Sequence, residues 1–136
     1  MLTRTDDLRI DQLRPLIPPA IVMEEIPTSD AQSQRIAAAR TAASSIIAGE
    51  DDRLLVVVGP CSIHDPAAGL EYARRLRPIA DRLASDLLIV MRTYFEKPRT
   101  TVGWKGLIND PNLDGSFSIN QGLRVARTFL RDVVDI

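Results

Sequence analysis

Two short apolar runs without polar interruption predict two buried strands. Residues 54–58 read LLVVV and residues 87–91 read LLIVM. Runs of this length without alternation are typical of strands covered on both faces. The runs begin 33 positions apart (87 minus 54), which is the spacing of a strand, a crossover helix and a parallel strand. We therefore expect two parallel strands whose carboxyl ends lie on one edge of a sheet.

Three further segments carry apolar residues at helical spacing. The first begins after Ser29, which forms a capping-box pattern with Gln32, and Gly49 is a suitable C-terminal stop. The second follows Asp65 and Pro66, which fit an N-cap and a first helical residue. The third begins near residue 118. Their apolar stripes are Ile36, Ala39, Ala43, Ile46 and Ile47; Leu70, Ala73, Leu76, Ile79 and Leu83; and Leu123, Ala126, Phe129, Leu130 and Val133.

Prolines modify this pattern in two places. Four of them fall within residues 1–28, namely Pro15, Pro18, Pro19 and Pro27. They predict an extended N-terminal arm, which gains stability only by lying on its own domain or on a neighbouring subunit. Pro78 lies inside the second helical stripe, so we expect a kink or a break near Arg77.

Composition narrows the class of protein. The chain has 136 residues, of which 45% are hydrophobic, and this is enough for one core. A net charge of -1 and a pI near 5.8 argue against a nucleic-acid binder or a membrane-surface binder. No apolar run is long enough to span a membrane, and the first residues lack a signal-peptide core. We expect a soluble, cytoplasmic protein.

A basic segment, residues 92–101, follows the second predicted strand and reads RTYFEKPRTT. Arg92, Lys97 and Arg99 place three cations in eight positions, and Pro98 stiffens the backbone between the last two. Guanidinium, ammonium and hydroxyl groups on one loop suit phosphate and carboxylate. The alternative is a solvated basic loop with Glu96 as its counter-ion.

The segment after the first strand, residues 59–65, reads GPCSIHD and is expected on the same edge. Cys61 is the only cysteine and His64 the only histidine, so this chain alone forms neither a disulfide nor a nitrogen- and sulfur-rich metal site. Cys61 is either a small buried hydrophobe or a metal ligand. His64 is either a second metal ligand or, as we favour, a structural or ligand-supporting group close to the helix start. Trp104, in a long loop further on, is either a substrate floor or, as we favour, an apolar anchor.

Together these motifs, with GWKGL at residues 103–107 and DDLRI at residues 6–10, closely resemble class I 3-deoxy-D-arabino-heptulosonate 7-phosphate (DAHP) synthase. The resemblance runs over nearly the whole chain. It implies a (β/α)8 TIM barrel that uses a divalent metal of the Mn, Fe, Co or Zn type. That enzyme joins phosphoenolpyruvate to D-erythrose 4-phosphate and releases phosphate, the opening step of the shikimate pathway to aromatic amino acids. The α/β chain would be its N-terminal part, with an arm at 1–28 and two βα units at 29–136.

The resemblance also assigns roles to individual residues. Cys61 corresponds to the metal ligand, and Arg92 and Lys97 to the groups that hold phosphoenolpyruvate. The erythrose 4-phosphate element corresponds to Lys97, Pro98, Arg99 and Thr100. Asp6 and Asp7 match an arm that helps to bind an aromatic amino acid inhibitor, although solvated acids are the alternative. Such an arm favours a homo-oligomer.

The remaining metal ligands of such an enzyme, a histidine, a glutamate and an aspartate, have no counterpart here. We therefore expect the 136 residues alone to be inactive. The competing interpretation is a non-catalytic module that binds phosphate or packs against a partner.

Overall fold

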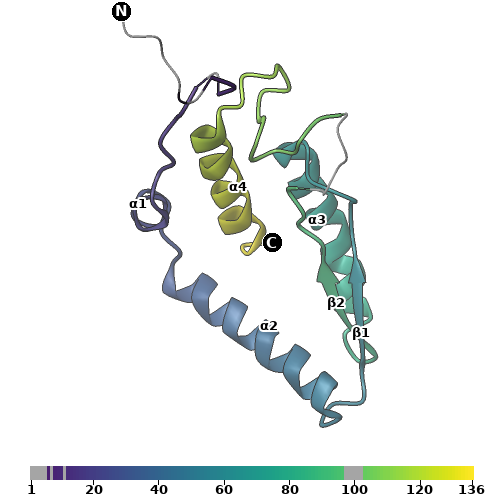
Figure 1. Ribbon diagram of the computed structural model, residues 1–136. Helices are drawn as coiled ribbons and strands as arrows, with labels where there is room; N and C mark the ends of the chain where they lie inside the picture. Colours follow the sequence, from purple (N-terminus) through teal and green to yellow (C-terminus); the bar gives the residue numbers. More distant parts are fainter. Residues whose placement is uncertain (1–5, 7, 11, 97–102) are drawn as a thin grey trace, which may run out of the picture.

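The computed structural model describes residues 6, 8–10, 12–96 and 103–136, and Figure 1 shows their arrangement. Within them the order of elements is α1, α2, β1, α3, β2, α4. Their bounds are α1 Pro19–Glu25, α2 Asp30–Ala48, β1 Leu54–Val58, α3 Pro66–Arg82, β2 Leu87–Met91 and α4 Ile119–Val133. No helix in this described part is long and apolar enough to cross a membrane.

The two strands form the expected parallel pair. Their register runs from Leu54 opposite Leu87 to Val58 opposite Met91, and α3 is the crossover between them. The prediction that both faces are buried is wrong for these residues, because the register partners Val57 and Val90 remain 60% and 39% exposed. The described helices do not cover the face that these two side chains share.

The core lies between α3, α4 and the segments that follow the strands. Ile63, Leu107 and Phe129 are almost completely buried. The Phe129 ring meets the ring of Phe95 edge to face, with centroids 5.8 Å apart, a favoured geometry for aromatic pairs. Gly69 lets α3 approach α4, since a Cβ there would lie 2.7 Å from Phe129 Cε2. The core therefore joins the last helix to both strand-end segments.

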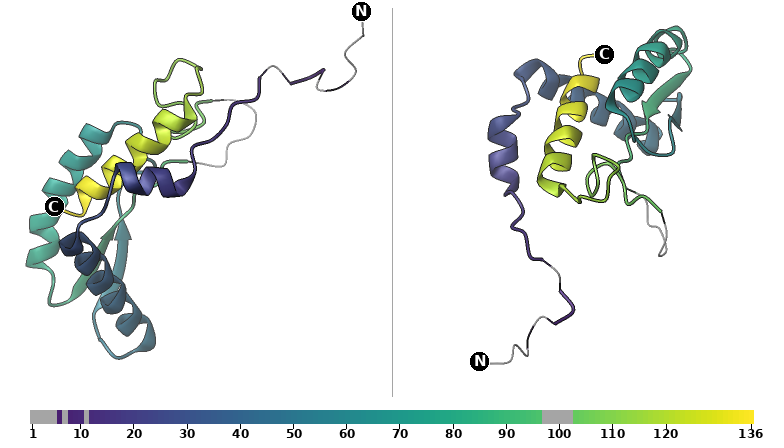
Figure 2. Two further views of the ribbon diagram at one scale, coloured as in Figure 1. Left: turned by 90° about the vertical axis from the view of Figure 1, so that its left-hand side faces the viewer. Right: turned by 90° about the horizontal axis from the view of Figure 1, so that it is seen from above.

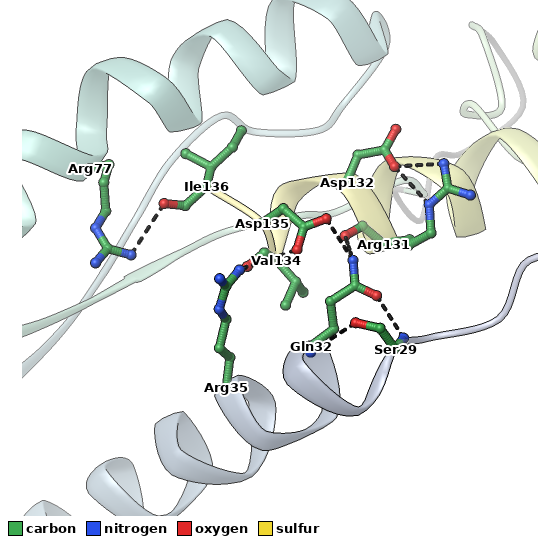
Figure 3. Close-up of polar contacts among 9 residues, drawn as sticks. All are labelled: Ser29, Gln32, Arg35, Arg77, Arg131, Asp132, Val134, Asp135 and Ile136. Atoms are coloured by element: carbon green, nitrogen blue, oxygen red, sulfur yellow. Dashed lines mark hydrogen bonds and ion pairs between the residues drawn. The ribbon is translucent and has the colours of Figure 1, made fainter.

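The N-terminus of α2 is bound to the C-terminal end of α4 (Figure 3). Ser29 and Gln32 form the predicted capping box. The Gln32 side chain also donates to the Arg131 carbonyl oxygen at 3.2 Å and to Asp135 Oδ2 at 2.7 Å. Arg35 adds an ion pair with Asp135 at 3.2 Å. A local cap thus doubles as a tertiary contact between two helices.

Three expectations about these elements need correction. The arm is not extended throughout, because Pro19 begins α1 instead of preventing a helix. The break that was one of the two alternatives near Arg77 does not occur, because α3 continues through Pro78, and proline removes only one of the many hydrogen bonds in this 17-residue helix. The apolar stripe of α3 is buried only in part, because Ala73 is buried but Ile79 remains 41% exposed.

Residues 12–18, which precede α1, extend beyond the end of α1 on the side where α4 begins (Figure 2). They are held beside the start of α4. The Ile17 amide donates to Asn120 Oδ1 at 2.9 Å, and Asn120 Nδ2 donates to the Pro15 carbonyl oxygen at 3.0 Å. Arg14 reaches the Ser116 carbonyl oxygen at 3.3 Å. This part of the arm therefore lies on its own domain, which was one of the two alternatives.

Candidate active site

Backbone hydrogen bonds bind the segment after β1 to the segment after β2. The Arg92 amide donates to the Val58 carbonyl oxygen at 2.7 Å, and the Ile63 amide donates to the Tyr94 carbonyl oxygen at 2.6 Å. Gly59 makes this approach possible, because its φ is +139° and a Cβ there would lie 2.9 Å from the Arg92 nitrogen. The predicted shared edge is confirmed, and residues 59–63 are positioned against residues 92–94.

Cys61 and Arg92 lie on this edge in different environments. Cys61 is exposed, so its interpretation as a small buried hydrophobe is wrong for the described structure. Arg92 is half-buried, and its guanidinium carbon lies 5.2 Å from the centre of the Tyr94 ring. That distance allows a cation–π interaction. The ring thus provides a surface that orients the cation.

The neighbours of Cys61 do not complete a metal site. Asp65 is occupied as the N-cap of α3, where its Oδ1 accepts from the Ala67 amide at 2.8 Å and from the Ala68 amide at 3.4 Å. His64 is exposed close to the start of that helix. No group of three histidine, cysteine, aspartate or glutamate side chains that could hold a metal ion occurs in the described part of the chain. Among the described residues of this edge, Cys61 is an accessible thiol that suits one ligand position of a metal site.

Glu96 forms contacts that the sequence did not predict. Its Oε1 accepts from the amides of Ile108 and Asn109 at 3.0 and 3.2 Å. Its Oε2 accepts from Asn109 Nδ2 at 2.7 Å. In addition, Glu96 pairs with Gly106 in an isolated antiparallel bridge. The Glu96 carboxylate therefore binds the turn formed by residues 106–109, a contact that is separate from its predicted role as counter-ion of the basic segment.

Trp104 has the anchoring contacts that we favoured from the sequence. Its indole nitrogen donates to the Asp110 carbonyl oxygen at 2.7 Å. Its half-buried ring packs against the core cluster of Ile63, Leu107 and Phe129. This loop is thus ordered by the core and lies directly beside the candidate site.

The arrangement of these segments agrees with the comparison to known proteins. The profile of the DAHP synthetase I family matches residues 25–136. The chain belongs to this family. A solved phospho-2-dehydro-3-deoxyheptonate aldolase from Francisella tularensis superposes with a TM-score of 0.89 at 50% identity, over 93% of this chain and 37% of that one.

Relatives in the DAHP synthetase I family show the same partial coverage. A phenylalanine-sensitive phospho-2-dehydro-3-deoxyheptonate aldolase of Escherichia coli is 56% identical over 132 residues, which are 97% of this chain and 38% of that protein. A tyrosine-inhibited aldolase of Schizosaccharomyces pombe is 53% identical over 96% of this chain and 35% of its own length. The chain thus spans well under half of these relatives.

Several residues predicted for the site lie outside the described structure. These are Lys97, Pro98, Arg99 and Thr100 in the basic segment, and Asp7 in the arm. Asp6 is described and exposed. The structure therefore brings Cys61 and Arg92 to one edge, and the roles of all these residues remain predictions.

Proposed function

We propose that this chain is part of a 3-deoxy-7-phosphoheptulonate synthase. The enzyme would condense phosphoenolpyruvate with D-erythrose 4-phosphate and give DAHP and phosphate. The observation that carries this proposal is the pair of backbone hydrogen bonds that fixes the Cys61 segment against the Arg92 segment. Membership of the DAHP synthetase I family and the names of the relatives support it.

In this reaction the protein mainly positions two anions and stabilises developing charge. We assign Arg92 and Lys97 to phosphoenolpyruvate, whose carboxylate and phosphate are natural partners of such cations. Lys97, Pro98, Arg99 and Thr100 would bind erythrose 4-phosphate. C3 of phosphoenolpyruvate then forms a carbon–carbon bond with the aldehyde carbon, and water supplies the oxygen that remains at C2 when phosphate leaves.

The family also implies a divalent metal, which Cys61 would hold together with ligands from outside the described residues. Such an ion supplies Lewis acidity at the aldehyde oxygen. A thiolate among the ligands suits iron, cobalt or zinc better than a hard cation such as magnesium. The exposed position of Cys61 on the same edge as Arg92 supports this assignment.

We further propose that residues 29–136 contribute the first two βα units of a (β/α)8 barrel, preceded by an arm at 1–28. The exposed Val57 and Val90 are what such a barrel requires, since further strands would cover the face they share. Asp6 and Asp7 would contribute to a site for an aromatic amino acid inhibitor, because relatives are phenylalanine-sensitive or tyrosine-inhibited. A homo-oligomer and a cytoplasmic location remain predictions.

The test uses the longest reading frame that contains this sequence. Phosphoenolpyruvate consumption is measured with erythrose 4-phosphate and a divalent metal, for wild type and for Cys61→Ala and Lys97→Ala. Arg74→Ala, which removes an exposed cation from α3, is the control. We expect turnover by wild type and the control, loss of activity in both test variants, and reduced metal content in Cys61→Ala alone.

The competing function is a non-catalytic module that binds phosphate or a partner. A folded, metal-loaded wild type that binds phosphate but consumes no phosphoenolpyruvate would support that module and refute the synthase. Unchanged activity in Lys97→Ala would leave the synthase in place but refute the role of this lysine.

A further inference from the structure

The loop that leads into α4 contains a spacing of polar residues that the candidate active site does not use. Residues 110–121 read DPNLDGSFSINQ. Acidic or amide residues at positions 1, 3 and 5, followed by glycine at position 6, are the pattern of a calcium-binding loop whose position 12 is a glutamate. Position 12 here is Gln121, which has a neutral oxygen in place of the carboxylate. The pattern predicts an oxygen-rich cation site that the structure must support.

Asp110, at position 1 of this loop, is a buried acid with an unpartnered oxygen. It is 6% exposed, and its Oδ1 has no hydrogen-bond partner among the described residues. Its Oδ2 accepts from the Gly115 amide at 3.2 Å, so the carboxylate is turned toward the loop. A buried carboxylate oxygen without a partner is costly, and a bound ion or water satisfies it. Asp110 therefore indicates a ligand within the loop.

The side chains at positions 3, 5 and 12 bring further oxygen atoms to the loop. Hydrogen bonds from Ser116 lower the pKa of Asp114, at position 5, and the side chain of Asp110 is among the smaller causes of the same shift. Gln121 reaches back to Asn112, at position 3, where its Nε2 donates to Asn112 Oδ1 at 3.0 Å. Amide groups can rotate by half a turn, so both amide oxygens can face a cation. Two neighbouring carboxylates favour a cation over water, because a cation offsets their repulsion.

The backbone of the loop meets two further requirements of the pattern. Gly115, at position 6, has a φ of +73°, in the left-handed region that favours glycine. The Ser116 carbonyl oxygen, at position 7, is a ligand in loops of this kind. A cavity of about 930 Å³ lies beside Gly115, Ser116 and Gln121, so a cation has access to the loop.

One contact works against a cation in this loop. Arg14 donates to the Ser116 carbonyl oxygen at 3.3 Å, and its positive charge repels a cation at that oxygen. Gln121 also supplies no charge at position 12. Both features predict a low affinity.

We propose that residues 110–121 form a weak calcium-binding site. All of its ligands are oxygen atoms, and flexible sites that use carboxylate, amide and backbone oxygens suit calcium better than magnesium. With two carboxylates, we expect a Kd of about 0.1–1 mM, the range of the weaker calcium sites. Binding would join Asp110 to Gln121 and so fix the loop to the first turn of α4. This inference does not rest on the proposed synthase function.

The experiment measures calcium binding by titration calorimetry in the longest reading frame that contains this sequence. Asp114→Asn removes a carboxylate from an exposed position, and Gln121→Glu supplies the carboxylate that the pattern has at position 12. Asp52→Asn and Gln34→Glu are the matched controls, because they make the same changes at exposed positions outside the loop. Thermal unfolding checks that every variant is folded.

We expect Asp114→Asn to weaken calcium binding about tenfold and Gln121→Glu to strengthen it about tenfold, since each changes one charged ligand. Both controls should bind calcium like wild type. Magnesium should bind more weakly than calcium, because the loop offers flexible oxygens instead of a rigid octahedral site.

Terbium, a luminescent analogue of calcium, locates the bound ion. The Trp104 indole nitrogen lies 2.7 Å from the Asp110 carbonyl oxygen, so this ring is next to the loop. Excitation of tryptophan should therefore produce terbium emission that calcium suppresses by displacing the ion. Trp104→Phe should lose this emission.

Two results would overturn the calcium site. One is the absence of saturable binding in wild type and in Gln121→Glu at calcium concentrations about tenfold above the expected Kd. The other is binding that neither Asp114→Asn nor Gln121→Glu changes, because the cation then lies elsewhere. Enzyme turnover is not part of either measurement, so a failure of the proposed synthase function would leave the result on calcium intact.

Discussion

Gln32 Nε2 donates a hydrogen bond to Asp135 Oδ2 at 2.7 Å, across 103 positions of sequence. Gln32 is only 5% exposed. Its side-chain Nε2 also donates to the Arg131 carbonyl oxygen, and its Oε1 accepts from the backbone amide of Ser29. A buried polar side chain is acceptable when its hydrogen-bonding groups have partners, as they do here. Gln32 therefore binds the start of α2 to the end of α4, together with the Arg35–Asp135 ion pair.

Replacing Gln32 with methionine should destabilise the fold by about 2 kcal/mol. The side chain keeps its length and helix propensity, but the Ser29 amide and the Arg131 carbonyl oxygen lose a partner in a buried site. Gln34→Met, on the exposed side of the same helix, is the control and should change stability by less than about 0.5 kcal/mol. Urea unfolding of both variants checks this, and equal midpoints would contradict it.

The same residue shows what sequence could and could not predict. The Ser29 capping box, the Asp65 N-cap and the 33-residue strand spacing depend on neighbours in sequence, and all three were confirmed. The contact of Gln32 with Asp135 depends on how α2 meets α4, which no local pattern encodes. The helix α1 was missed because Pro19 was taken as a breaker, although proline is well suited to a first helical position.

In the candidate site, too, local sequence patterns predicted some features and missed one that depends on tertiary contacts. Its shared edge followed from the parallel strand pattern, and the basic segment was recognised from its motif. The contact of Glu96 with Asn109 was missed, because a glutamate beside Lys97 and Arg99 is most simply interpreted as their counter-ion. A signal was nevertheless present in Gly106, since a glycine in an ordered loop often marks a close approach of another group, here the Glu96 carboxylate.

The ion pair between Glu25 in α1 and Arg124 in α4 should lower the stability of the fold when acid protonates Glu25. Arg124 donates to both carboxylate oxygens, at 2.7 and 3.0 Å. These hydrogen bonds lower the pKa of Glu25 from its ordinary 4.5. Because the pKa of Glu25 is lower in the folded state than in the unfolded state, the ion pair stabilises the fold fully at pH values above the unfolded-state pKa. This contribution to the free energy of unfolding is lost as the pH falls from 4.5 through the folded-state pKa.

Urea unfolding of wild type and Glu25→Gln across the acid range tests this dependence. Wild type should be the more stable protein at neutral pH, and the difference should disappear in acid. Glu24→Gln removes the same charge from the same helix and should not reproduce the effect, because the Arg124 hydrogen bonds go to Glu25. A constant gap between wild type and Glu25→Gln at every pH would count against the ion pair as its cause.

The Tyr94 ring should influence phosphoenolpyruvate affinity through Arg92, if the proposed function holds. The guanidinium carbon lies 5.2 Å from the ring centre, and a cation–π contact at such a site contributes about 0.5–1 kcal/mol. Tyr94→Leu should therefore raise the KM for phosphoenolpyruvate by roughly two- to fivefold. Tyr94→Phe retains the ring and should leave that KM unchanged, so a similar rise in both variants would indicate that the hydroxyl matters instead.

Gly122→Ala should destabilise the protein, although alanine in place of a helical glycine normally stabilises by about 1 kcal/mol. Gly122 is buried in α4, and an added Cβ would overlap the carbonyl oxygen of Ile108. Because Ile108 belongs to the turn that binds Glu96, the clash is relieved only by moving α4 or that turn. Overpacking of this kind typically costs about 1–3 kcal/mol.

Gln121→Ala, at the exposed neighbouring position, is the control. It removes the exposed side-chain hydrogen bonds with Asn112 but adds no overlap, and it should cost about 0.5 kcal/mol. Thermal unfolding measures the stability of both variants. Amide hydrogen exchange at Ile108 and Asn109 then reports whether the turn has moved, since both amides are protected by Glu96 in the wild type. If Gly122→Ala proves as stable as the control and exchange at both amides is unchanged, the close approach of α4 to the turn is not a constraint on the fold.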